Sequence, residues 1–153
     1  MDEEQTSILI IDDSEDICTG LKGIFEAKGY PAETALSAGE GLEKAERRGF
    51  NIALIDIKLP DRSGVEVLKG IRRKHPTTLG IMITGYANLE NAAASLNEGA
   101  FAYLQKPLDR EKVLETVKRA AETQRELKIA TEKSVAEFIK RRAEKLREEG
   151  KLP

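Results

Sequence analysis

The sequence predicts an α/β protein with a doubly wound, five-stranded parallel sheet, helices on both faces and a C-terminal helical extension. Apolar runs alternate five times with segments of helical character along the 153 residues. Most of these runs are continuously apolar, which is typical of strands in a parallel sheet covered on both sides. From residue 109 to 149 there is no glycine or proline, which favours a long helical segment.

Each strand is predicted from a short apolar run that ends at a polar residue or a turn signal. In chain order the runs cover residues 7–11, 30–35, 52–55, 80–84 and 100–104. The third run leads directly into Asp56, and Pro60 prevents a long continuation of the strand. An acid at the carboxyl end of a buried parallel strand stands where open α/β sheets place their ligand sites.

Helices are predicted between these runs from their start and stop signals. Ser14 and Ser37 are suitable N-caps, and Gly29 is a suitable end for the first helix. A third helix is expected before Pro76, an alanine-rich one over about 87–96, and a last one from near Asp109.

Composition restricts the function classes. The net charge is −2, with −5 on residues 1–108 and +3 on residues 109–153, so there is no broad basic footprint for nucleic acid. One cysteine and one histidine are too few for the usual zinc site. The N-terminus is acidic and no apolar run reaches spanning length, so we expect a cytoplasmic protein without a membrane partner.

Polar groups follow four of the five predicted strands. They are Asp12 with Asp13, then Asp56, Thr84 and Lys106. Converging carboxylates favour a hard divalent cation such as Mg²⁺, and an ammonium and a hydroxyl suit a phosphoryl group attached to a carboxylate nucleophile. Each residue taken singly could equally be a helix cap, a turn residue or a surface lysine.

The motifs that carry these residues resemble the receiver domains of two-component response regulators over about residues 8–123. They are Asp12-Asp13, Asp56 with Leu59-Pro60-Asp61 and Gly64, Thr84-Gly85, and Tyr103-Leu104-Gln105-Lys106-Pro107. The resemblance implies a flavodoxin-like strand order 2-1-3-4-5. It also implies a cis Lys106–Pro107 bond, which only a bond before proline readily tolerates.

The same resemblance implies a role for each matching position. Asp56 is the expected acceptor of a phosphoryl group from a sensor histidine kinase, and the chain is expected to be a phosphoacceptor rather than an enzyme. Mg²⁺ is expected at Asp12, Asp13, Asp56 and the backbone carbonyl of Lys58. Thr84 and Lys106 are expected to hold the phosphoryl group, and Tyr103 to turn inward on activation.

Two further positions, Lys58 and Tyr86, flank the expected pocket and in this family influence hydrolysis of the acyl phosphate. A long lysine and a bulky tyrosine shield the group from water, so we expect slow self-dephosphorylation. The alternative is that both simply lie on the surface.

The expected domains are a receiver over 1–124 and a helical extension over 125–153. Phe138 and Ile139 in the extension are expected to pack on a second subunit, on the domain's own surface or on a partner. A homodimer through the face of the fourth helix, fifth strand and fifth helix, together with the tail, is one expected use. About 30 residues are too few for a typical DNA-binding output domain, so DNA binding is not expected.

Three alternatives to a receiver switch follow from the residues. A phosphorelay intermediate that passes the phosphoryl group to a histidine phosphotransfer protein remains open. A haloacid-dehalogenase-type enzyme is excluded, because the second acid it normally carries two residues after the nucleophile is replaced by Lys58. A nucleotide-binding flavodoxin-like protein is disfavoured, because no glycine-rich loop follows the first strand.

Overall fold

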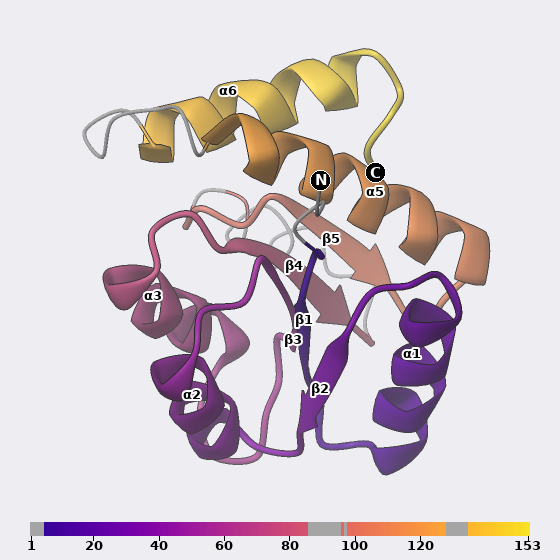
Figure 1. Cartoon of the computed structure of the whole chain (residues 1–153), viewed down its shortest axis with the longest axis vertical. Helices are drawn as coiled ribbons and strands as arrows, with labels where there is room; N and C mark the ends of the chain where they lie inside the picture. Colours follow the sequence, from indigo (N-terminus) through magenta and orange to yellow (C-terminus); the bar gives the residue numbers. More distant parts are fainter. Residues whose placement is uncertain (1–4, 86–95, 97, 128–134) are drawn as a thin grey trace.

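The computed structural model describes residues 5–85, 96, 98–127 and 135–153, and its centre is one parallel sheet (Figure 1). The strand order is β2-β1-β3-β4-β5, with all four neighbouring pairs parallel. The predicted fold class and strand order are therefore confirmed. The strands are β1 (Ile8–Ile11), β2 (Ala32–Ala35), β3 (Ile52–Asp56), β4 (Leu79–Thr84) and β5 (Ala102–Gln105).

Helices cover both faces of the sheet (Figure 1). On one face lie α1 (Glu15–Ala27) and α5 (Arg110–Leu127), and on the other lie α2 (Ala38–Arg47) and α3 (Gly64–Lys74). A last helix, α6 (Val135–Glu148), lies along α5. The alanine-rich helix predicted over 87–96 falls almost entirely outside the described residues.

Serine caps determine where the first three helices begin. The side chains of Ser14, Ser37 and Ser63 each accept a hydrogen bond from the backbone N–H three residues later. The two helix starts predicted at Ser14 and Ser37 are confirmed. Gly29 follows α1 with a φ of 87°, a left-handed conformation that glycine adopts without steric cost.

The second strand is shorter than the sequence predicted, because Tyr30 lies in the turn that follows α1. The backbone N–H of Tyr30 donates to the Phe25 carbonyl at 2.9 Å, and the two rings meet edge to face with centroids 6.4 Å apart. Pro31 has no N–H to give to a strand ladder. Only Ala32–Ala35 pairs with β1.

Alternate residues of the buried strands divide the apolar core into two layers. In β1, Ile8 and Ile10 join the cluster under α1 and α5, whereas Leu9 and Ile11 join the cluster under α2 and α3. All four are fully buried. This two-sided burial explains why the strands read as continuous apolar runs rather than as alternating ones.

The C-terminal tail packs on the domain's own surface, which is one of the three predicted possibilities. Buried residues of α6 join the core cluster beneath α1 and α5, and Phe138 is partly buried against it. An ion pair from Arg142 Nη2 to Glu126 Oε2, 2.7 Å long, also joins α6 to α5. The buried residues of α6 are Val135, Ile139, Ala143 and Leu146.

α5 continues to Leu127, three residues past the boundary predicted at 124, and Gln124 and Leu127 are buried. The predicted boundary between 1–124 and 125–153 therefore falls within α5, and the division into two domains remains a prediction.

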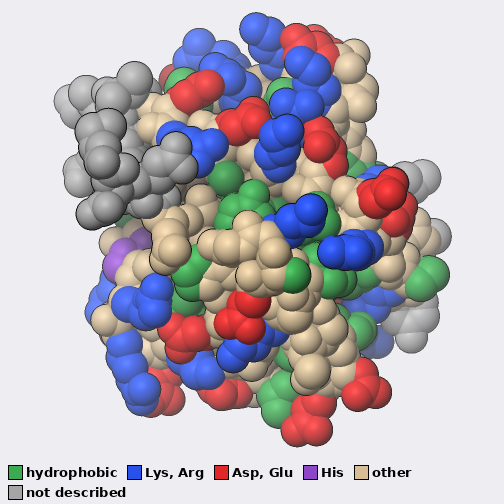
Figure 2. Space-filling view, turned by 45° about the vertical axis from the view of Figure 1, so that its right-hand side comes forward, with side chains coloured by type: hydrophobic (Ala, Val, Ile, Leu, Met, Phe, Trp, Pro, Cys, Tyr) green, Lys and Arg blue, Asp and Glu red, His purple; other side chains and the backbone are tan. Residues whose placement is uncertain are grey.

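Figure 2 shows basic side chains, with acidic ones among them, gathered over the upper part of the molecule where α5 and α6 lie. None of the helices in the described part of the chain is long and apolar enough to span a bilayer.

Candidate functional site

Strand register brings the polar residues at the strand ends to one edge of the sheet. Ile11 of β1 pairs with Ile55 of β3, so Asp12 and Asp56 follow at the same level. On the other side of β3, Thr84 ends β4 and pairs with Gln105, the residue before Lys106. Because all the strands are parallel, these ends share the carboxyl edge.

Three carboxylates and one ammonium meet at this edge. One carboxylate oxygen from each of Asp12, Asp13 and Asp56 lies within 4.8 Å of the others. Asp12 is completely buried and Asp56 is 6% exposed, whereas Asp13 is exposed to solvent. Lys106 Nζ lies 3.0 Å from Asp12 Oδ2 and 3.2 Å from Asp56 Oδ2.

The site shifts the pKa values of two of these groups. Burial raises the pKa of Asp56, and the nearby charge of Asp12 acts in the same direction. The Lys58 backbone N–H and the Lys106 ammonium oppose that rise without cancelling it. Burial by itself would lower the pKa of Lys106, but its contacts with Asp12 and Asp56 outweigh burial and the pKa rises.

Backbone N–H groups fix one oxygen of each buried carboxylate. Ser14 N donates to Asp12 Oδ1 at 2.9 Å, and Lys58 N donates to Asp56 Oδ1 at 3.0 Å. Asp12 Oδ2 is buried and accepts no hydrogen bond of good geometry from the described residues, although Lys106 is close to it. A cluster of carboxylate oxygens with such a buried acceptor has the donor chemistry that hard divalent cations prefer.

Comparison with known proteins identifies the family of this chain. The family model described as "Response regulator receiver domain" matches residues 8–118. The chain belongs to this family. The receiver is 38% identical, over 120 residues, to the nitrogen assimilation regulatory protein NtrX of Azorhizobium caulinodans. That match covers 77% of this chain and 26% of NtrX, so the chain spans about a quarter of that relative's length.

Solved receiver structures match over nearly their whole length. A CheY-like receiver domain protein from Methanospirillum hungatei JF-1 is 46% identical, with a TM-score of 0.76 over 80% of this chain and 98% of that chain. The beryllofluoride-activated NtrC4 receiver domain dimer is 32% identical, with a TM-score of 0.75 over 78% and 99%. Both comparisons show that this chain has the same fold as these solved receiver domains.

Three more of the predicted site residues, Thr84, Tyr103 and Lys58, lie on or beside the same edge. Thr84 is buried at the end of β4, and Tyr103 in β5 is partly buried against the core layer under α2 and α3. Lys58 is exposed and its backbone forms a bridge with Ser63. The Lys106–Pro107 bond is cis, as the family resemblance implied. Tyr86 lies outside the described residues.

The sequence reasoning missed a positioning role for Asp61. Its Oδ1 accepts from the Ala38 N–H and its Oδ2 from the Gly39 N–H, both at 2.9 Å. These hydrogen bonds lower the pKa of Asp61. They attach the loop after β3 to the first turn of α2, which stabilises the loop that carries Lys58. The helix start that Asp61 contacts lies 22 and 23 residues earlier in the chain, so no local signal in the sequence indicates the contact.

Gly64 lies so close to the backbone of Asp56 that no other residue fits at this position. A Cβ at this position would lie 2.2 Å from the Asp56 carbonyl oxygen and 2.9 Å from the carbonyl carbon. The Gly64 N–H donates to the Ile57 carbonyl at 2.7 Å, so α3 begins tightly against the end of β3. The close approach leaves no space for a side chain.

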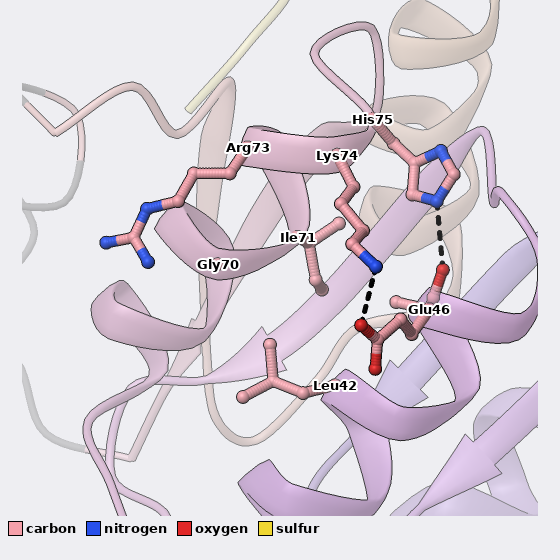
Figure 3. Close-up of a pocket in the computed structure, with 8 residues that line it drawn as sticks. Leu42, Glu46, Gly70, Ile71, Arg73, Lys74 and His75 are labelled. Carbon is pink, nitrogen blue, oxygen red and sulfur yellow. Dashed lines mark hydrogen bonds and ion pairs between the residues drawn. The ribbon is translucent and has the colours of Figure 1, made fainter.

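A separate hollow of about 260 Å³ lies between α2 and α3 (Figure 3). Two of the charged side chains at its rim pair with each other, because Lys74 Nζ lies 2.5 Å from Glu46 Oε1. His75 Nε2 also lies 3.0 Å from the Ala45 carbonyl oxygen. None of the four residues that form the carboxylate and ammonium cluster lines this hollow, so it does not belong to the site at the sheet edge.

Replacing Gly64 by alanine should destabilise the receiver by about 1–3 kcal/mol, because the added methyl meets backbone that cannot move independently of Asp56. Gly20→Ala is the matched control. Gly20 lies exposed within α1 with nothing within 4 Å of the added Cβ, so this change should stabilise by about 0.5–1 kcal/mol. Urea unfolding followed by circular dichroism measures the stability of both variants. Equal changes in stability would contradict the proposed steric role of Gly64.

Asp56→Asn should raise the urea midpoint at neutral pH in EDTA. A folded-state pKa above the unfolded one means that ionised Asp56 costs stability, so stability is lost as pH rises through the folded pKa. The difference should shrink as pH falls and Asp56 takes up a proton. Asp16→Asn, in the first turn of α1, should change the midpoint slightly in the opposite direction. A less stable Asp56→Asn variant at neutral pH would refute this prediction.

Proposed function

We propose that this chain accepts a phosphoryl group on Asp56 from the phosphohistidine of a cytoplasmic sensor histidine kinase. The observation that carries the proposal is the buried Asp56 carboxylate at a strand end, 3.2 Å from Lys106 and grouped with two further acids. A neighbouring ammonium and a cation-binding acidic cluster are what a transferring phosphoryl group needs. The chain is a substrate of this transfer rather than a turnover enzyme.

Mg²⁺ is the metal that we propose for the acidic cluster. Asp12, Asp13, Asp56 and the backbone carbonyl of Lys58 would hold it, and the buried Asp12 Oδ2, which lacks a hydrogen bond from the described residues, supports that assignment. When bound, the ion neutralises charge on the oxygens of the transferring group.

The chain's own residues then have distinct tasks. A carboxylate oxygen of Asp56 bonds to phosphorus while the bond from phosphorus to the histidine nitrogen breaks, and the nitrogen keeps that electron pair. Lys106 pairs with the phosphoryl oxygens of the new acyl phosphate, and the Thr84 hydroxyl donates to them. Movement of Thr84 leaves space for Tyr103 to turn inward, which changes the face of β5 and α5 together with the helix predicted over about 87–96.

The output of this switch is proposed to be pairing of two chains through that face and the tail. The apolar residues of α6 are buried against the chain's own core, so pairing through them requires α6 to leave α5. The activated NtrC4 receiver is a dimer, which supports the proposal. A phosphorelay role, in which Asp56 passes the phosphoryl group to a histidine phosphotransfer protein, is the second candidate and needs no output domain.

Incubation with acetyl phosphate and Mg²⁺ should add one phosphoryl group to the full chain, detected by intact-mass spectrometry. Asp56→Asn should abolish the addition and Asp16→Asn should leave it unchanged, since Asp16 is exposed on α1 away from the cluster. The decay of the modified species also tests the shielding proposed for Lys58 and Tyr86. A half-life of only seconds contradicts the shielding, and modification of Asp56→Asn contradicts the assigned acceptor.

Light scattering of the full chain with beryllofluoride and Mg²⁺ should show a dimer, whereas the untreated chain should be monomeric. Asp56→Asn is the control, because it lacks the carboxylate that holds beryllofluoride and should keep the untreated mass. An unchanged mass for the wild-type chain rejects pairing as the output. Phosphoryl transfer from Asp56 to a histidine phosphotransfer protein would then identify the relay role.

A further inference from the structure

A second cleft of about 440 Å³ lies between α3, the segment before β5, and α6. Charged side chains line it together with apolar ones. Arg72 comes from α3, and Lys140 and Arg147 come from α6. Its volume is within the range typical of small-molecule sites. The cleft exists only because the tail is docked, since α6 supplies one of its walls.

Arg72 is the unusual residue of this cleft. It is half-buried, and its Nε is buried with no hydrogen-bond partner among the described residues. Its one protein hydrogen bond there is long, 3.4 Å from Nη1 to the Gly99 carbonyl oxygen. A buried guanidinium nitrogen without an acceptor is costly, and an oxyanion satisfies it best because the planar fork matches two oxygens.

Gly99 allows this arrangement. Its φ is 100°, and a Cβ there would lie 2.5 Å from Arg72 Nη1. The glycine therefore lets the guanidinium group lie against the backbone at the edge of the cleft. The position of the Arg72 guanidinium group therefore depends on the backbone conformation and the missing side chain at Gly99.

The other charges of the cleft leave a surplus of positive charge. Arg147 Nη1 donates to the Phe101 carbonyl at 3.1 Å, and neither Arg147 nor Lys140 pairs with a carboxylate in the described part of the chain. Of the two acids in the lining, Glu98 is neutralised by Lys69 at 2.6 Å. Glu144 remains, so three cations face one uncompensated acid.

We propose that this cleft binds a small ligand through a doubly charged oxyanion, either a phosphate or a dicarboxylate, held by Arg72 from the receiver body and by Lys140 and Arg147 from α6. Such a ligand joins α3 to α6 and stabilises the docked tail by mass action. It thereby opposes release of the tail, and only this last consequence rests on the function proposed above.

Isothermal titration of the unphosphorylated full chain in EDTA and low salt tests the site, with inorganic pyrophosphate and succinate as probes. Measurable binding of either is expected, and the stronger probe identifies phosphate or carboxylate chemistry. Arg72→Gln should weaken binding by about tenfold, whereas the adjacent Arg73→Gln should leave it unchanged, because Arg73 is exposed and does not line the cleft.

Two further variants distinguish binding in this cleft from a disturbed α3 and from binding at the carboxylate site. Lys140→Gln changes an exposed residue of α6 and should also weaken binding, even if Arg72→Gln disturbs α3. Lys106→Gln should leave binding unchanged, because Lys106 lies in the carboxylate site. Absence of binding by both probes, equal effects of Arg72→Gln and Arg73→Gln, or loss of binding only in Lys106→Gln would overturn the proposal.

Discussion

The contact of Lys106 with two buried carboxylates is the interaction on which the rest of the site depends. Asp12 and Asp56 are close enough to repel each other, and burial makes the ionised state of Asp56 unfavourable, as its raised pKa shows. The Lys106 ammonium lies within 3.2 Å of both and reduces that repulsion. The Lys106 contacts therefore allow the Asp12 and Asp56 carboxylates to lie close together in a buried site. Carboxylate oxygens of the cluster remain available to bind a cation.

That arrangement depends on the sheet, because the three charged groups come from three different strands. Asp12 follows β1, Asp56 ends β3, and Lys106 follows β5, which is joined to β3 through β4. The paired registers bring these strand ends to one edge of the sheet. The loop after β3 then depends on two contacts outside the sheet. Asp61 attaches the loop to α2, and Gly64 lets α3 start directly against the Asp56 carbonyl.

The tail extends the receiver core instead of standing apart from it. The buried residues of α6 share a cluster with α1, α5 and one face of the sheet, and Arg147 reaches the carbonyl of Phe101 just before β5. β5 carries Tyr103 and leads into Lys106, so the tail and the carboxylate site are connected to opposite ends of one short strand. A change at either end of β5 therefore has a direct structural path to the other.

The sequence by itself determined the fold class, the serine caps at Ser14 and Ser37, and the identity of the residues at the strand ends. These features follow from local periodicity and from the chemistry of single residues, both of which depend only on nearby positions in the chain. A local signal misled at the edge of an element, as at Tyr30, where contacts with Phe25 hold the residue in the turn after α1 rather than in the predicted strand. Strand order and the cis bond at Pro107 came from family resemblance rather than from the pattern.

Tertiary structure alone decided which distant groups meet. The attachment of Asp61 to α2, the contact of Arg72 with Gly99 and the packing of α6 on the chain's own core all join segments far apart in sequence. The weak apolar stripe of α6 fits a second subunit as well as its own domain. Only the shape and apolar surface offered by the folded body select between those surfaces, because burial is not directional and depends on what is available to pack against.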